Sequence, residues 1–142
     1  MSAELDLFFR IGAAVLAGAI IGIERLLSHK IAGMRTYAMV SAGSAAFMYL
    51  ATTVFQGASA NPYVVMGQIV VGVGFLGAGS IINNKGEVQG LTTASGLWVT
   101  AAAGAAFGLG FYSTGFLISC FALLILAVLY KVEKHITDKY LK

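Results

Sequence analysis

The sequence predicts an all-α integral membrane protein, a single domain (residues 1–142) built as a bundle of five transmembrane helices. Three observations lead to this fold class. First, 58% of the residues are hydrophobic and only 11% are charged, a balance that soluble domains do not have. Second, eight of the nine Lys and Arg residues fall in three short segments, Glu24–Thr36, Asn83–Leu91 and Lys131–Lys142. Third, the apolar stretches between these segments are long enough to cross a bilayer.

Each predicted span supplies roughly the 20 apolar residues that a hydrocarbon core of about 30 Å requires. The acidic Glu4 and Asp6 replace the basic region of a cleavable signal peptide, so we expect the first span to be retained. Glycines at Gly108–Gly110 separate the last two spans, because one continuous helix would be about twice too long. The five predicted spans are Leu5–Ile23, Thr36–Phe55, Val64–Ile82, Thr92–Leu109 and Tyr112–Tyr130.

The basic segments also predict a topology. Positive residues near short loops face the cytoplasm, and five spans place all three basic segments on one side of the membrane. An even number of spans would divide them between the two sides. We therefore expect the N-terminus outside and the C-terminus in the cytoplasm, with loops Gln56–Tyr63 and Gly110–Gly115 outside. The net charge of +3 is explained by this topology, so we expect no nucleic-acid partner.

Small residues recur at four-residue spacing on predicted helix faces. Ala14, Gly18 and Gly22 do so in the first span, and Gly104 and Gly108 in the fourth. This small-xxx-small pattern lets helix backbones approach closely. It predicts tight packing through Gly and Ala faces, and self-association of the chain with a dimer favoured.

The third span is richer in glycine than helix packing alone requires. Gly72, Gly74, Gly77 and Gly79 lie within eight positions, and each costs about 1 kcal/mol of helix propensity relative to Ala. Two interpretations are open. Either several neighbours crowd this helix, or the helix is kinked or broken there and exposes carbonyl groups to a cavity.

The connector between the first two spans carries one group of candidate functional residues, Glu24, Arg25, Arg35 and Thr36. Glu24 is the only acid in a basic segment. If it faces inward, an ion pair with Arg35 would close the helical hairpin. Arg25 and Lys30 are instead interpreted as topology anchors that contact lipid phosphates.

The start of the fourth span carries the second group, Thr92, Thr93 and Ser95, which follow Gly90. Unpaired N–H groups and the helix dipole favour an anion or carboxylate at such a position. Plain N-capping explains one or two of the three hydroxyls.

Enzyme chemistry finds no support in the residue pattern. The sequence holds no Ser/His/acid set and no His/Cys cluster with metal spacing, and it has a single cysteine, Cys120. We therefore expect no enzyme activity, no cofactor and no metal site. Arg10, inside the first span, is expected to pair with Asp6 four residues earlier or to extend toward the outer interface.

Four motifs resemble the transmembrane domain of the MgtC/SapB family: GIER at 22–25, AGMRT at 32–36, GQIVVGVGFLGAGSII at 67–82 and VQGLTTASGLWVTAAAG at 88–104. The resemblance implies a bacterial inner-membrane protein linked to magnesium-limited growth and, in pathogens, to virulence. It also implies modulation of membrane energetics, with ATP synthase as a possible partner. Many members of the family carry a cytoplasmic ACT-like domain after the last span, so this chain is expected to be a short form or a trimmed piece.

Two functional hypotheses follow. In the first, the bundle presents its cytoplasmic face, built around Glu24, Arg35, Thr92 and Thr93, to a membrane partner or an anionic ligand. In the second, the chain conducts Mg²⁺, another ion or a small solute along Gly72–Gly79. Mg²⁺ prefers carboxylate and water ligands, and no Asp or Glu lies in the middle of a predicted span.

Overall fold

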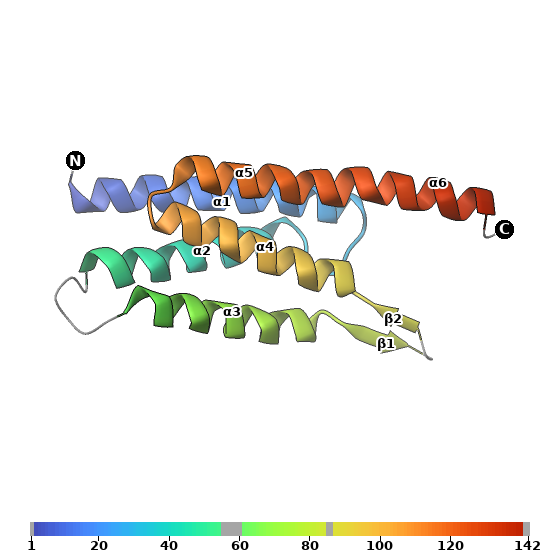
Figure 1. Cartoon of the computed structure of the whole chain (residues 1–142), viewed down its shortest axis with the longest axis horizontal. Coiled ribbons are helices and arrows are strands. Elements are labelled where there is room, and N and C mark those ends of the chain that lie inside the picture. The colour runs from blue at the N-terminus through green and yellow to red at the C-terminus, as the bar shows by residue number, and fades with distance from the viewer. Residues whose placement is uncertain (1, 55–60, 85–86, 141–142) are drawn as a thin grey trace.

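The computed structural model describes residues 2–54, 61–84 and 87–140, which are almost entirely helical (Figure 1). The second helix ends in a π-helical turn, Leu50–Val54, and another π-helical turn, Ile125–Leu129, joins the last two helices into one continuous rod. The described helices are α1 (Ala3–Leu27), α2 (Met34–Tyr49), α3 (Pro62–Gly79), α4 (Leu91–Gly108), α5 (Tyr112–Leu124) and α6 (Tyr130–Tyr140).

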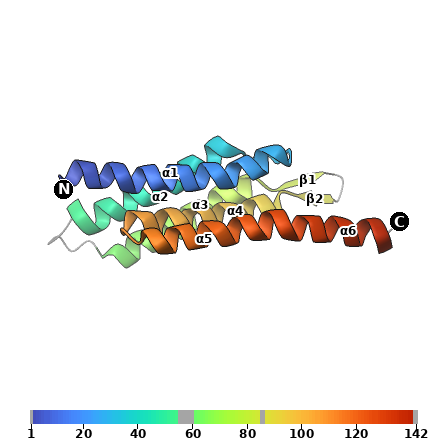
Figure 2. The same cartoon turned by 90° about the horizontal axis from the view of Figure 1, so that it is seen from above.

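The helices run along the long axis of the molecule, and the two ends of the chain lie at opposite ends of the bundle (Figures 1 and 2). The connector between α1 and α2, the β-hairpin and α6 all lie at the end that holds the C-terminus. We call this end the basic end and the opposite one the N-terminal end. The described parts of the three basic segments therefore share one end of the bundle. The side of the membrane that this end faces stays a prediction.

Three helical stretches in the described residues are long and apolar enough to cross a membrane: α1, α3 and Tyr112–Lys139. The helix α4 lies in the middle of the bundle, and 11 of its residues are buried. A helix surrounded by protein has little contact with lipid, so α4 tolerates threonine, serine and glycine. The prediction of an all-α membrane protein with five helices is confirmed, with α5 and α6 counted as one rod.

One segment departs from the predicted helices. The third helix ends at Gly79 rather than Ile82, because the chain then forms a short antiparallel hairpin of β1 (Ile82–Asn84) and β2 (Glu87–Gln89). The Ser80 hydroxyl donates to the Gly77 carbonyl oxygen at 2.7 Å and helps to end the helix. The predicted turn at Lys85-Gly86 and most of the predicted loop Gln56–Tyr63 lie outside the described residues.

Glycines bring α1, α2 and α4 into backbone contact. A methyl group on Gly104 of α4 would lie 2.8 Å from the Cα atom of Ser41, and one on Gly18 of α1 would lie 2.6 Å from the Tyr37 carbonyl oxygen. Gly22 and Gly108 meet the α2 backbone in the same way. These three helices therefore form the tightly packed part of the bundle.

The glycine-rich helix α3 is a continuous α-helix at the edge of the bundle, with only Val73 and Gly77 buried. The interpretation that it is broken is wrong, because its Pro and Asn61 N-cap start a regular helix that runs to Gly79. Crowding applies only to Gly77, where an added methyl would touch Ala94 of α4 at 3.4 Å. Gly72 and Gly79 have open space around them.

Candidate functional site

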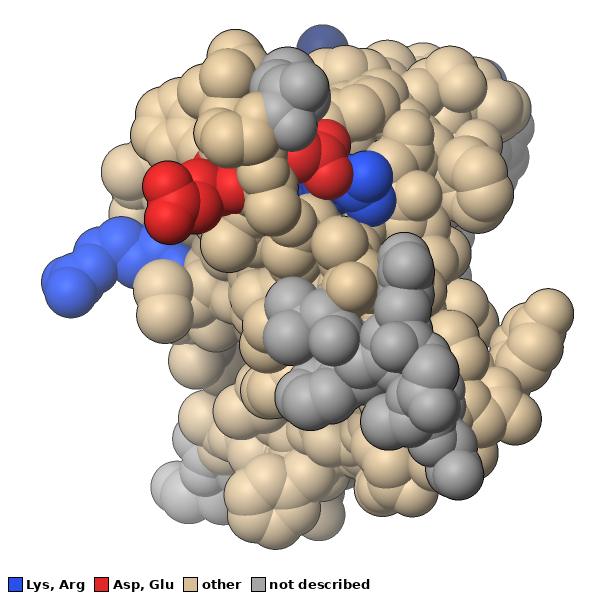
Figure 3. All heavy atoms as spheres, turned by 90° about the vertical axis from the view of Figure 1, so that its left-hand side faces the viewer, with Lys and Arg blue, Asp and Glu red and all other residues tan. Residues whose placement is uncertain are grey.

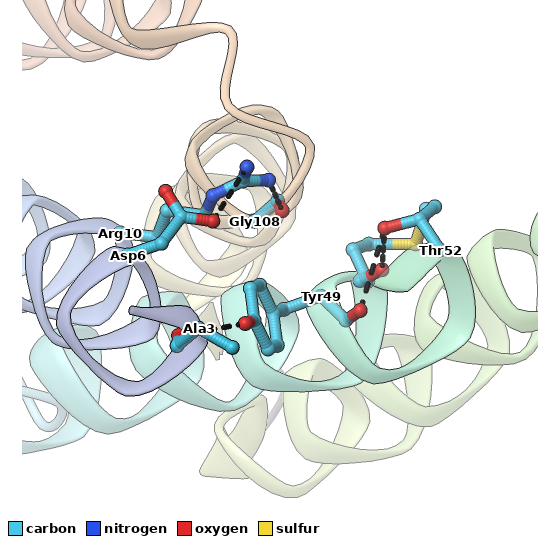
Figure 4. A network of polar contacts seen from close by, with 7 residues as sticks. Ala3, Asp6, Arg10, Tyr49, Thr52 and Gly108 are labelled. Atoms are coloured by element: carbon cyan, nitrogen blue, oxygen red, sulfur yellow. Dashed lines mark hydrogen bonds and ion pairs between the residues drawn. The ribbon is translucent and has the colours of Figure 1, made fainter. Parts of the chain in front are cut away.

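The N-terminal end holds a polar network centred on Arg10 of α1 (Figure 4). One terminal nitrogen of Arg10 lies 2.8 Å from the carboxylate of Asp6, and the other donates to the Gly108 carbonyl oxygen at 2.8 Å. The guanidinium also lies 5.3 Å from the ring centroid of Tyr49, whose hydroxyl donates to the Ala3 carbonyl oxygen at 2.8 Å. The predicted pairing of Arg10 with Asp6 is confirmed.

This network fastens helices together. Gly108 is the last residue of α4, where carbonyl groups lack helical partners and a cation is favourable. Arg10 thus ties the start of α1 to the end of α4, and Tyr49 ties in α2. Around these residues, the N-terminal end shows mostly uncharged surface with a few charged atoms (Figure 3). The geometry explains Arg10 as a structural clamp.

The basic end holds a second ion pair, between neighbouring residues. The Arg25 side chain is only 2% exposed, and its Nε donates to a carboxylate oxygen of Glu24. The other Glu24 oxygen accepts a hydrogen bond from the Ser28 hydroxyl at 2.9 Å. The interpretation of Arg25 as a lipid-facing anchor is therefore wrong, because this side chain lies on the buried face of α1.

The expected ion pair between Glu24 and Arg35 is also wrong. Arg35 lies in the first turn of α2 and is exposed, whereas Tyr37 is fully buried. Two residues along a helix correspond to a rotation of about 200°, so Arg35 points away from the face that packs on α1. Glu24 forms its ion pair with Arg25 instead.

Arg25 lies in the wall of a recess at the basic end with a volume of about 590 Å³. Segments far apart in the sequence meet there: Lys30 comes from the connector, Thr92 from the first turn of α4, and Glu133 and Lys134 from α6. The recess also has an apolar wall formed by the π-helical turn Ile125–Leu129.

The three hydroxyls at the start of α4 do not act together. Thr92 is exposed and lines the recess, but Thr93 is buried and its carbonyl oxygen accepts a hydrogen bond from the Tyr37 hydroxyl at 3.0 Å. The Ser95 hydroxyl donates back to the Leu91 carbonyl oxygen at 2.9 Å.

None of these hydroxyls caps the helix. The N-cap residue of α4 is Gly90, with a φ of 94° and no side-chain capping bond. The first intrahelical bond of α4 runs from the Ala94 N–H to the Gly90 carbonyl oxygen. The N–H groups at 91–93 come before it and have no helical partner.

A second recess, of about 680 Å³, lies between α2 and α3 and is almost wholly apolar. Thr36 lines it, so this candidate residue is separated from the recess at the basic end. Gly72 and Gln68 of α3 also line it. Gln68 is exposed in the recess, and no hydrogen bond of its side chain to another described residue is present.

Sequence reasoning missed the role of α6. Glu133 and Lys134 are exposed and line the recess with Tyr130, Thr137 and Asp138. The signal was present in the spacing, since these positions follow i, i+3, i+4, i+7 and i+8 on one helix face. Among the described residues, no group of three or more His, Cys, Asp or Glu is arranged to hold a metal ion.

Comparison with known proteins gives a consistent result. Residues 11–135 match the MgtC family. The chain is 38% identical over 133 residues to the Escherichia coli K12 protein named "Putative magnesium transporter YhiD", covering 89% of this chain and 61% of that protein. It is 39% identical over 119 residues to the Brucella abortus protein MgtC, covering 84% of this chain and 49% of that protein. No solved structure matches the chain.

A third relative is covered over more of its length. The Synechococcus elongatus protein SrpB is 37% identical over 143 residues, covering 92% of this chain and 78% of that protein. The chain thus spans about three fifths of the Escherichia coli relative and about half of the Brucella one. The matched region includes the recess at the basic end up to residue 135, but it begins after Ala3, Asp6 and Arg10 of the N-terminal network.

Proposed function

The chain belongs to the MgtC family, and from this premise we propose that it is a multi-pass protein of the bacterial inner membrane that supports growth when magnesium is scarce. It is a membrane protein whose apolar helices contact the lipid bilayer, and the Escherichia coli relative is named as a putative magnesium transporter. Within that role, the chain acts as a non-enzymatic modulator of other membrane components. ATP synthase is the proposed partner, and in a pathogen the same role would support virulence.

The observation that carries this proposal is the meeting of three separate segments around the buried Arg25. The connector, the start of α4 and α6 all contribute charged or hydroxyl side chains to one recess at the basic end. Ionisable side chains buried in membrane proteins often have a functional role, and Arg25 is such a side chain. A surface built from several segments is also suited to contact with a partner.

Growth at low magnesium tests the proposal. In a bacterium lacking its own family member, we expect Glu24→Gln to impair growth, because it leaves the buried Arg25 charge without its partner. Arg35→Gln makes a matched control at the same end, and we expect it to grow as the wild type does. Expression and thermal stability of both variants are measured in membranes. A folded Glu24→Gln protein that supports normal growth would refute a role for this pair.

The partner is tested separately by cross-linking in native membranes. We expect ATP synthase subunits to be recovered with the wild-type chain and to be reduced by Glu24→Gln but not by Arg35→Gln. Recovery that is equal for all three proteins would show contact unrelated to the recess. No recovery above a control membrane protein would exclude this partner.

Transport of Mg²⁺ or another small solute is the second candidate. The name of the Escherichia coli relative favours it, and so does the recess between α2 and α3. Gly72 has no atom within 4 Å of an added methyl and lines the recess, so the side chain of Gly72→Leu would begin in open space and occupy part of the recess. Gly12, equally open on α1, provides the control Gly12→Leu. Magnesium flux into liposomes that is lost only in Gly72→Leu would favour transport over modulation.

Self-association is proposed through the same recess, as a dimer. Gln68 lies about 10 Å from the start of α3, in the hydrocarbon region, where an amide gains from an interhelical hydrogen bond. Two copies of Gln68 are self-complementary, because an amide both donates and accepts. Native mass measurement should show a dimer that Gln68→Leu weakens. A Gln68→Leu protein that is as dimeric as the wild type would exclude this interface.

A further inference from the structure

We propose that the recess at the basic end is a binding site for the phosphate group of a membrane phospholipid, with the guanidinium of Arg25 as its buried anchor. This inference rests on the proposed function, because it names a ligand for the same recess at the basic end. It is tested on the purified protein, so a failure of lipid binding and a failure of the growth phenotype are separate results.

The first observation is the unused hydrogen-bonding capacity of Arg25. A guanidinium has five N–H donors, and here the Nε donor alone is taken by Glu24. No described residue accepts a hydrogen bond from the two terminal nitrogens, although the side chain is 98% buried and lines the recess. Such a planar pair of nitrogens matches two oxygens of a phosphate group.

The second observation is the charge around Arg25. Lys30 from the connector and Lys134 from α6 add two cations, and Thr92 adds the first turn of the 18-residue helix α4. Free N–H groups and the helix dipole at that turn favour an anion. Phosphate oxygens would therefore meet donors from several sides.

The third observation decides which phosphate fits. Glu133 also lines the recess, and its negative charge disfavours inorganic phosphate, which carries more than one charge at neutral pH. A lipid phosphodiester carries a single charge. Ile125, Leu126 and Leu129 extend the recess along the apolar part of the same helix rod, where acyl chains would lie. The chemistry of the walls is that of a phospholipid, polar at one end and apolar at the other.

The π-helical turn adds a structural reason for this shape. The apolar wall residues all belong to the π-helical turn Ile125–Leu129, which is wider than the α-helix on either side. Such turns occur often at functional sites. Here the turn lies where α5 leaves the bundle and continues into the exposed α6.

The test measures lipid binding to the purified full chain in detergent by native mass spectrometry. The probes are dioctanoyl phosphatidylethanolamine, dioctanoylglycerol, which lacks the phosphate, and inorganic phosphate, which lacks the chains. We expect the phospholipid to bind at least about tenfold more tightly than dioctanoylglycerol, and inorganic phosphate not to displace it.

Two pairs of variants locate the site. We expect Arg25→Gln to weaken phospholipid binding by about tenfold or more, and Arg35→Gln, which removes the same charge outside the recess, to bind as the wild type does. If Arg25→Gln fails to fold, two substitutions of exposed residues on α6 test the site instead. Lys134 lines the recess, so Lys134→Gln should weaken phospholipid binding by about two- to fivefold. Lys131 does not line it, so Lys131→Gln should bind as the wild type does.

Three results would overturn the proposal. Equal binding by Lys134→Gln and the wild type, together with equal binding by any folded Arg25→Gln protein, would show that the recess does not hold the phosphate. Equal losses in Arg35→Gln or Lys131→Gln would indicate general attraction to the basic end. Displacement of the lipid by inorganic phosphate at similar concentration would assign the site to a free phosphate.

Discussion

Replacing Gly104 with alanine should destabilise the bundle, and the structure gives the size of the effect. The added methyl would lie 2.8 Å from both the Cα atom and the carbonyl carbon of Ser41, and closer still to the Ser41 carbonyl oxygen. Comfortable contacts between carbon atoms are about 3.5–4.0 Å, so α4 and α2 would have to separate by roughly 1 Å. Overpacking of this kind costs about 1–3 kcal/mol.

The same substitution at Gly12 isolates that cost. No atom lies within 4 Å of a methyl placed on Gly12, which is also inside a transmembrane helix. Both substitutions gain about 1 kcal/mol of helix propensity, so this gain cancels in the comparison. The difference between the two variants is then the strain alone, about 1–3 kcal/mol in favour of Gly12→Ala.

Unfolding in mixed micelles of dodecyl maltoside with increasing sodium dodecyl sulfate provides the measurement, followed by circular dichroism. Gly104→Ala should unfold at a lower fraction of sodium dodecyl sulfate than the wild type, and Gly12→Ala at an equal or higher fraction. Equal midpoints for the two variants would refute the close approach of α4 to α2. The arrangement of the tightly packed helices would then have to be revised.

Three further predictions use the same unfolding assay. Tyr37→Phe loses the hydroxyl that donates to the Thr93 carbonyl oxygen and should cost about 1–2 kcal/mol; no change would exclude a contribution from this bond. Arg10→Gln loses its ion pair and its bond to the Gly108 carbonyl oxygen and should cost about 2–3 kcal/mol, more than Tyr37→Phe. Gly110→Ala should cost at least about 1 kcal/mol, since its φ is 84° and its methyl would meet the Arg10 guanidinium at 3.2 Å; wild-type stability would contradict this conformation.

Much of the fold follows from the sequence because a bilayer imposes simple rules. Apolar length and basic loops placed most helix bounds within a few residues of the observed ones, although the last rod runs ten residues past Tyr130, to Tyr140, and the third helix ends three residues before Ile82. There the apolar run continues through Ser80 into β1, so hydropathy gives no sign that the helix has ended. The end is set instead by a local bond from the Ser80 hydroxyl, after which the chain forms the β-hairpin; a membrane-span pattern records neither feature.

The candidate site was less predictable, because the rotation of each helix about its axis depends on packing. The sequence marked Glu24, Arg25 and Arg35 as candidates but could not tell which side chains face inward. The rotation of α2 follows from Tyr37, whose fully buried ring lies against Gly96 of α4. A methyl group added to Gly96 would lie 2.6 Å from the Tyr37 hydroxyl. Once Tyr37 faces α4, Arg35 must face outward.

The two polar sites act on different parts of the bundle. Arg10 and Arg25 lie 15 residues apart on α1, about 22 Å along the helix, so one rigid element carries both. Arg10 holds the end of α4, and Tyr37 holds its start through Thr93. Hydrogen bonds thereby join α1, α2 and α4 at the N-terminal end, and α2 to α4 at the basic end.

The helix α6 is held differently, because its residues at 130–139 are all exposed. It meets the connector where the Lys30 ammonium lies 5.7 Å from the centroid of the Tyr130 ring. A phosphate bound between Arg25 and Lys134 would add a second link from α6 to the rigid helices, and an empty recess would leave α6 with the Lys30–Tyr130 contact and the apolar contacts of the π-helical turn. Occupancy of the recess would therefore change the position of α6 more than that of α1, α2 or α4. The affinity of a partner that contacts α6 would then depend on whether the lipid is bound.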